Sequence, residues 1–108
     1  MLSNLNVSNT LVSGNKIFTP LLSLIFHLLL SIRESDIKLN YMSFFLVDER
    51  RWNINLNNGV KILLPETKVL DTLKLLKKLD SKYNVLGGKF VEIDLRIYRK
   101  FFLKPKIN

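Results

Sequence analysis

The chain has 108 residues, a formal net charge of +8 and no cysteine. This length suits one small domain, and the lack of cysteine excludes disulfides, thiolate metal sites and a cysteine nucleophile. The positive charge is compatible with binding to nucleic acid or to an anionic membrane surface. However, the chain is rich in Lys and Asn and has no Ala, a usage typical of A+T-rich genomes. We therefore interpret the charge as incidental and expect no nucleic-acid partner.

Residues 1–18 are predicted to form an N-terminal loop with one short strand near Leu11. A helix should follow and run to about Ile32. Its start is indicated by Thr19, a good N-cap residue, followed by Pro20, which suits the first helical position.

This first predicted helix is strongly apolar. Its polar residues Ser23, His27 and Ser31 fall on one narrow stripe, so most of its circumference should be buried by protein or by lipid. The apolar segment 17–32 has 16 residues, fewer than the roughly 20 that span a bilayer. An alternative hypothesis is therefore a small basic protein that associates with a membrane through residues 17–32.

Residues 38–47 are predicted to form a strand with two mostly apolar faces, which favours a central or sheltered position in a sheet. A charged turn at Asp48-Glu49 should lead from this strand into the next segment.

Residues 50–66 have the pattern of a β-hairpin, with apolar and polar residues alternating on both sides of a turn. Trp52 lies in the first strand of this hairpin. Asn58-Gly59 is predicted to form a tight primed turn, because both residues tolerate positive φ. Pro65 should end the second strand, because it has no N–H for the ladder.

Residues 66–83 are predicted to form an amphipathic helix. Val69, Leu73, Leu76 and Leu79 form one apolar stripe that should pack on the sheet. The opposite arc is rich in lysine, which usually indicates a solvated face. The lysines of this arc are Lys74, Lys77, Lys78 and Lys82.

Two strands should end the chain, one over residues 91–97 and a last one within residues 98–104. In the first of them, Ile93, Leu95 and Ile97 should share one face. The predicted fold class is α+β: a curved, mostly antiparallel sheet of about five strands with two helices packed on it. Residues 19–108 are expected to form a single domain.

The sequence contains no motif that indicates an enzyme. His27 is the only histidine and has no ligand-type residue at metal-binding spacing. Asp94 and Arg96 are more typical of an ion pair than of an acid–cation catalytic site. We therefore predict no catalytic residue, no metal, no cofactor and no small-molecule substrate.

Four short segments, taken in order, resemble motifs of the FtsQ/DivIB cell-division family. These segments are Leu11-Val12-Ser13-Gly14, Arg50-Arg51-Trp52, Leu64-Pro65-Glu66 and Ile93-Asp94-Leu95-Arg96. The structural motif residues that this resemblance selects are Arg51, Trp52, Gly59, Pro65, Asp94 and Arg96. Each segment is short, but their order and spacing across most of the chain make the set specific.

The resemblance implies a non-catalytic division scaffold. Members of that family have a cytoplasmic tail, a transmembrane helix, a POTRA domain and a β domain on the periplasmic side of the inner membrane. This chain resembles only the β domain, so we expect a fragment of such a protein, with membrane association through a region that it lacks. The resemblance further implies that FtsB/FtsL-like divisome partners bind at the C-terminal sheet edge. The residues expected to contact them are Ile97, Tyr98, Phe101, Phe102 and Leu103.

Overall fold

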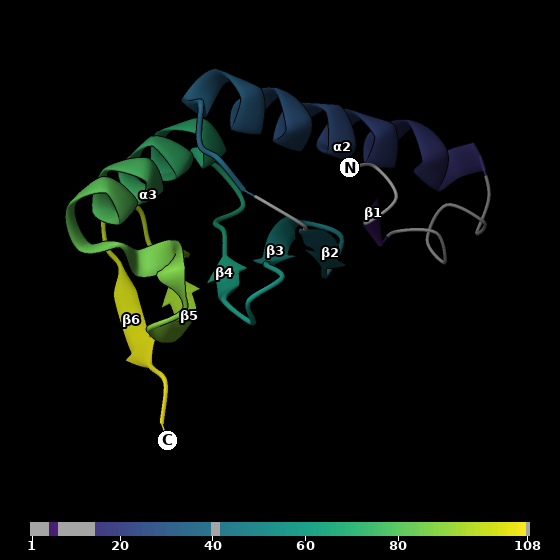
Figure 1. Ribbon diagram of the computed structural model, residues 1–108. Helices are drawn as coiled ribbons and strands as arrows, with labels where there is room; N and C mark the ends of the chain where they lie inside the picture. Colours follow the sequence, from purple (N-terminus) through teal and green to yellow (C-terminus); the bar gives the residue numbers. More distant parts are fainter. Residues whose placement is uncertain (1–4, 7–14, 40–41, 108) are drawn as a thin grey trace.

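A six-stranded sheet with its strands in chain order forms the centre of the protein (Figure 1). The computed structural model describes residues 5–6, 15–39 and 42–107, and the strand expected near Leu11 lies outside them. The elements are β1 (Leu5–Asn6), α2 (Asn15–Ser35), β2 (Ser43–Val47), β3 (Arg51–Asn55), β4 (Lys61–Leu63), α3 (Val69–Tyr83), the 3-10 turn η2 (Val85–Gly87), β5 (Phe90–Asp94) and β6 (Phe102–Pro105).

The sheet is mixed but mostly antiparallel, which confirms the predicted α+β class. β1 pairs with β2, and β4 with β5, in parallel. The other three neighbouring pairs are antiparallel. The parallel step from β4 to β5 is made possible by α3, because a parallel connection needs a long crossover.

One row of apolar side chains runs straight across five strands. Phe44, Ile54, Ile62, Ile93 and Leu103 lie opposite one another in successive pairs from β2 to β6. The first four have no exposed surface, whereas Leu103, on the last strand, is half-buried. Opposed residues share one face of a sheet, so this row marks the face that carries the core.

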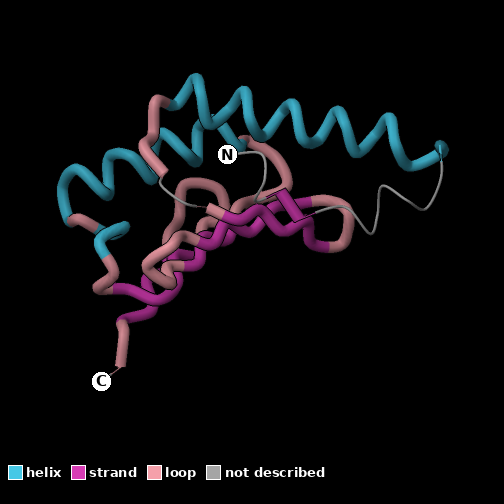
Figure 2. The backbone as a smooth tube through the Cα atoms, turned by 45° about the vertical axis from the view of Figure 1, so that its right-hand side comes forward, coloured by secondary structure: helices cyan, strands magenta, loops and turns pink. Residues whose placement is uncertain are grey.

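Both helices cover that same face of the sheet (Figure 2). α3 buries Val69, Leu73, Leu76 and Leu79, which confirms the predicted apolar stripe. Its lysines are exposed, as expected. The helix starts at Val69 rather than at Glu66, because Lys68 has a left-handed backbone conformation that a right-handed helix cannot include.

α2 packs with Leu21, Ile25 and Leu28 toward the core. The helix begins before the predicted start at Thr19. Ser31 is buried, and its hydroxyl donates a 2.7 Å hydrogen bond to the backbone carbonyl of His27. The outward face carries a strongly exposed Phe26, so burial of most of the circumference by protein or by lipid stays a prediction.

The β3–β4 connection is a hairpin, but its turn is not the predicted primed turn. Gly59 has φ of 90°, whereas Asn58 is absent from the residues with positive φ. The Gly59 N–H donates to the Leu56 carbonyl, and the Leu56 N–H donates to the Val60 carbonyl. This pattern is a three-residue loop, in which an ordinary turn is followed by a left-handed glycine bulge.

The first of the two C-terminal strands is shorter than predicted. β5 ends at Asp94, so Ile97 does not share its buried face and is instead exposed. Arg99 has φ of 63°, and the Lys100 N–H donates to the Ile97 carbonyl, so the chain reverses between the strands. The last strand ends with Pro105, one residue beyond the predicted range.

No helix within the described ranges is long and apolar enough to cross a membrane.

Candidate functional site

The last strand, β6, lies at the end of the sheet, as predicted, and among the described residues it pairs only with β5. Its surroundings carry an unusual amount of exposed apolar surface. We call the five residues predicted to bind partners the edge patch; they are Ile97, Tyr98, Phe101, Phe102 and Leu103. The first four are between 42% and 55% exposed, and Leu103 is half-buried. The structure therefore brings all five sequence-predicted residues to one end of the sheet.

The edge patch wraps around the strand rather than covering one face. Leu103 lies opposite Ile93 on the face that the helices cover. Phe102 lies opposite Asp94 on the other, helix-free face. A partner that covers both side chains must therefore approach the edge itself, since neither face alone presents them together.

The backbone of β6 has its free hydrogen-bonding groups at Leu103. The Leu95 N–H donates to the Leu63 carbonyl, so odd-numbered residues of this part of β5 point toward β4 and Asp94 points toward β6. Its opposite residue Phe102 then points back toward β5, and Leu103 points away from the sheet. By the same alternation, Pro105 also points outward, where it offers a carbonyl but no N–H.

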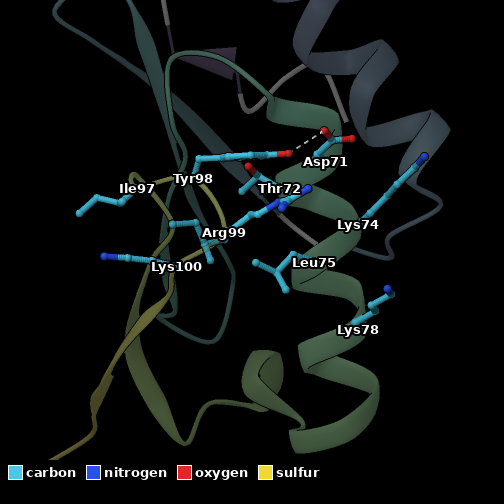
Figure 3. Close-up of a pocket in the computed structure, with 10 residues that line it drawn as sticks. Asp71, Thr72, Lys74, Leu75, Lys78, Ile97, Tyr98, Arg99 and Lys100 are labelled. Carbon is cyan, nitrogen blue, oxygen red and sulfur yellow. Dashed lines mark hydrogen bonds between the residues drawn. The ribbon is translucent and has the colours of Figure 1, made fainter.

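The turn before β6 packs against α3. The Tyr98 hydroxyl lies 3.5 Å from a carboxylate oxygen of Asp71, and the Arg99 guanidinium lies 5.2 Å from the centre of the Tyr98 ring (Figure 3). These residues help to line a hollow of about 370 Å³ between the turn and α3. Sequence reasoning missed this hollow, because nothing in the residue pattern indicates that Asp71 and Tyr98 meet.

A polar cluster on the helix-free face brings together three of the motif residues. Two nitrogens of the Arg96 guanidinium, Nε and Nη2, donate to the Asp94 carboxylate, at 2.9 and 2.7 Å. The hydrogen bond from Arg96 lowers the pKa of the Asp94 carboxyl, partial burial opposes this shift, and the positive charge of Arg51 adds to it. Arg51 itself donates a 2.8 Å hydrogen bond to Asn53. Asp94 and Arg96 are thus held by hydrogen bonds at the end of β5, and Arg51 on β3 acts on Asp94 through its charge.

The other three motif residues have structural positions. Trp52 is 3% exposed and meets Phe44 edge-to-face, with ring centres 6.3 Å apart. Gly59 supplies the left-handed residue of the hairpin loop, and Pro65 is buried directly after β4. Sequence reasoning also missed Asn58, whose side-chain amide donates a 2.8 Å hydrogen bond to the Leu86 carbonyl and ties the loop to η2.

The described residues contain no group of three His, Cys, Asp or Glu side chains placed to hold a metal ion. His27, the residue considered for such a role, is exposed on α2.

Residues 13–96 match the family described as cell division protein FtsQ/DivIB, C-terminal. This span contains the whole polar cluster and Trp52. It ends at Arg96, directly before the first residue of the edge patch.

Curated relatives of the chain include cell division proteins named FtsQ. That of Rhizobium radiobacter is 32% identical over 62 residues, which cover 57% of this chain and 30% of the relative. That of Bradyrhizobium diazoefficiens is 39% identical over 51 residues, covering 47% and 15%. That of Caulobacter vibrioides is 37% identical over 60 residues, covering 56% and 20%. The chain thus spans less than a third of the length of these relatives.

Proposed function

The chain belongs to the FtsQ/DivIB cell-division family, and on this premise we propose that it is a non-catalytic scaffold piece that binds FtsB/FtsL-like partners by strand addition to β6. The proposal rests on one observation above all: β6 is an edge strand whose neighbouring apolar side chains are exposed. An exposed apolar edge is a liability in a monomer, because it invites pairing with other chains. A dedicated partner strand would turn this liability into a binding site.

The geometry of β6 supports one mode of binding. An added strand would take its main-chain hydrogen bonds from the N–H and carbonyl of Leu103, which point away from β5. Pro105 would limit pairing toward the C-terminus, because it lacks a donor. Phe102 and Phe101 would then supply side-chain contacts that select the partner.

A non-catalytic role is supported by the state of Asp94, the carboxylate that was considered for an acid–cation catalytic site. Its carboxylate accepts two side-chain hydrogen bonds from Arg96, and its pKa is lowered. A carboxylate held in its charged form is a poor general acid at neutral pH, and its oxygens are already engaged. We therefore assign Asp94 to holding the fold together rather than to chemistry.

The family relationship also suggests where this binding takes place. We propose the periplasmic side of the inner membrane as the site, with membrane attachment supplied by regions outside the matched segment.

The test is a pull-down of the chain with the periplasmic part of an FtsB–FtsL pair. The variants are Phe101→Ser with Phe102→Ser, and the control is Ile107→Ser, which removes a still more exposed apolar side chain beyond β6. We expect the double variant to bind at least about tenfold more weakly, as loss of central aromatic contacts does. The control should bind like the wild type. Equal binding by all three proteins, each folded by circular dichroism, would rule out the edge patch.

Proline substitution tests the backbone component separately. At Leu103 it removes the outward donor, whereas at Phe102 it removes a donor that points toward β5 and should disturb the sheet itself. Leu103→Pro is therefore the informative change, provided that the variant folds. Unweakened binding of folded Leu103→Pro would argue against strand addition even if the side-chain variants lose binding.

A further inference from the structure

A second surface, distinct from the edge patch, lies where the end of α2 meets α3. It is a hollow of about 590 Å³. Four lysines and two serines line this lysine hollow: Ser35, Lys74, Lys77, Lys78, Ser81 and Lys82. Its lining therefore carries four positive charges, one of which, on Lys77, is paired with the neighbouring carboxylate of Asp36.

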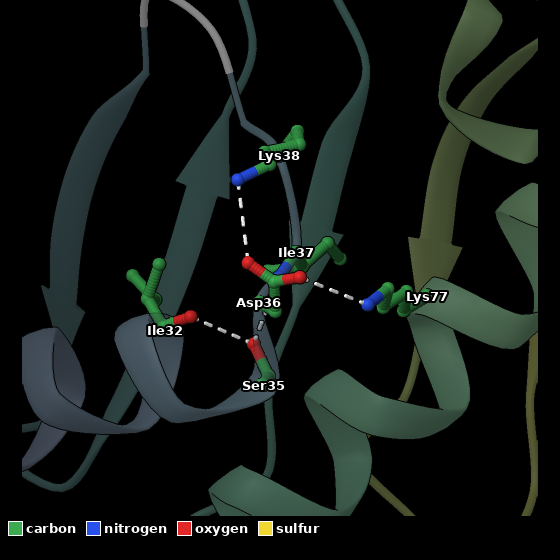
Figure 4. Close-up of polar contacts among 6 residues, drawn as sticks. All are labelled: Ile32, Ser35, Asp36, Ile37, Lys38 and Lys77. Atoms are coloured by element: carbon green, nitrogen blue, oxygen red, sulfur yellow. Dashed lines mark hydrogen bonds and ion pairs between the residues drawn. The ribbon is translucent and has the colours of Figure 1, made fainter.

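The lysines of the hollow repel one another along α3. Lys74 and Lys78, like Lys78 and Lys82, are four residues apart, a spacing at which like charges destabilise a helix. The nearby carboxylate of Asp36 is shared between Lys77, at 3.4 Å, and Lys38, at 3.3 Å (Figure 4). Among the ion pairs of the described residues, Lys77 is the one member of the lysine hollow that has a carboxylate partner.

Lys74 and Lys78 line both hollows, but their side chains extend past the edge patch. In Figure 3, Lys74 and Lys78 extend from α3 away from Ile97 and Lys100. All four lysines are exposed, with 47% of the Lys77 side chain accessible even in its ion pair. Their ammonium groups are thus available to an anionic partner that approaches from the helical side of the molecule.

An exposed apolar stripe lies on the outward face of α2, before the end of this helix that borders the lysine hollow. Phe26 is 67% exposed and Leu30 is 51% exposed. Leu30 precedes Ser35, which lines the hollow, by five residues, or about 7.5 Å along the helix axis. Since α2 and α3 both lie on one side of the sheet (Figure 2), one broad partner can reach the stripe and the hollow.

We propose that this helical side docks on an anionic lipid surface. The lysines of the hollow would bind lipid phosphates, while Phe26 and Leu30 would enter the boundary between headgroups and acyl chains. Charge complementarity selects an anionic partner, and the exposed Leu30 selects a lipid over a nucleic acid, which offers phosphates but little for an aliphatic side chain. The helix would lie on the membrane and not cross it. This proposal is independent of partner binding at β6.

The experiment is co-sedimentation of the whole chain with vesicles. One set contains phosphatidylcholine with about a quarter phosphatidylglycerol, a content that gives a negative surface potential, and the other contains phosphatidylcholine alone. We expect binding to the anionic vesicles only, and its loss at high salt, because screening weakens attraction to the surface.

Two sets of variants locate the surface. Lys74→Gln, Lys78→Gln and Lys82→Gln together should weaken binding at least about tenfold, since each lysine near an anionic surface adds to affinity. Phe26→Ser with Leu30→Ser should weaken it as well, because less apolar area enters the boundary. The matched control is Lys89→Gln, Lys104→Gln and Lys106→Gln, which removes the same charge from β6 and its surroundings, outside the lysine hollow. It should keep most of the binding.

Several results would overturn the proposal. Equal losses in the two lysine triple variants would mean that net charge alone attracts the chain. Binding to phosphatidylcholine alone, or no binding to either vesicle, would exclude an anionic lipid site. Self-association that Leu30→Ser abolishes would assign the stripe to a second copy of the chain. A lipid-free pull-down with the FtsB–FtsL pair is unaffected by these outcomes, so the two proposals fail separately.

Discussion

The centre of the sheet and its C-terminal edge both carry large apolar side chains, but in opposite environments. In the β3–β4 hairpin, Trp52 is 3% exposed and Ile54 and Ile62 have no exposed surface. At the edge, Phe102 is 55% exposed although apolar residues flank it on both sides. The difference comes from position, because the hairpin has strands on both sides and a helical layer above. Apolar side chains at the centre therefore stabilise the fold, whereas most of those at the edge stay in contact with water.

The largest expected effect is at the centre. Trp52→Ala should lower the free energy of unfolding by about 3–5 kcal/mol, the range for a large buried aromatic residue replaced by alanine. The loss includes its edge-to-face contact with Phe44. Urea denaturation followed by circular dichroism measures the change. Trp52→Phe is the control and should retain most of the stability; a small effect of Trp52→Ala would mean that the hairpin is not the centre of the core.

The hairpin loop should be the next most sensitive point. Gly59 has φ of 90°, and a Cβ added there would meet no atom within 4 Å. The cost of Gly59→Val is therefore backbone strain alone, about 1–3 kcal/mol for a β-branched residue in this conformation. Gly59→Asn should cost clearly less, because asparagine tolerates left-handed φ. Equal melting temperatures for the two variants would contradict the left-handed assignment.

The polar cluster that joins the centre to the edge should have an intermediate effect, and one that depends on pH. Asp94→Asn should destabilise the protein by about 1 kcal/mol at neutral pH, a modest value because the Arg96 side chain is 48% exposed.

The sign of the pH effect follows from the lowered pKa of Asp94. Its pKa in the folded protein lies below the usual 3.8, so the stabilisation is fully present above about pH 4. It is lost as the pH falls through the folded value, where the folded protein takes up its proton. The difference in unfolding free energy between wild type and Asp94→Asn should therefore shrink on acidification. A constant difference from neutral to acidic pH would show that the ion pair is not its cause.

Periodicity predicts the buried face of each strand and helix but not the turns between them. The row from Phe44 to Ile93 and the stripe on α3 follow from spacing alone, because burial of one face dictates alternation. The sign of φ in a loop depends on loop length and on the register of the flanking strands. A primed-type conformation occurs at Asp48 and Glu49, with φ of 52° and 56°, and not at the Asn-Gly pair that usually indicates it.

The candidate site also shows that spacing in the sequence predicts some features and not others. The five residues of the edge patch could be selected from the sequence, since a last strand with one neighbour in sequence tends to lie at an edge. The cluster of Arg51, Asp94 and Arg96 could be selected only as separate motifs. Their meeting depends on the pairing of β3, β4 and β5, and no spacing in the chain encodes which strands become neighbours.

The smallest expected effect is at the edge, and it tests the comparison most directly. Phe102→Ser should change the free energy of unfolding by less than about 0.5 kcal/mol, because the side chain is already mostly in water. Leu103→Ser, one residue further, should cost clearly more, since Leu103 packs against the core opposite Ile93. The two residues are neighbours on one strand and lie on opposite faces of the sheet. Urea denaturation of both variants therefore separates the effect of side-chain burial from the effect of position in the chain. If Phe102→Ser is as destabilising as Leu103→Ser, the edge belongs to the core. If Phe102→Ser leaves stability intact, its phenylalanine has no role in the isolated fold, and weakened partner binding by the same variant then reports lost contacts instead of lost structure.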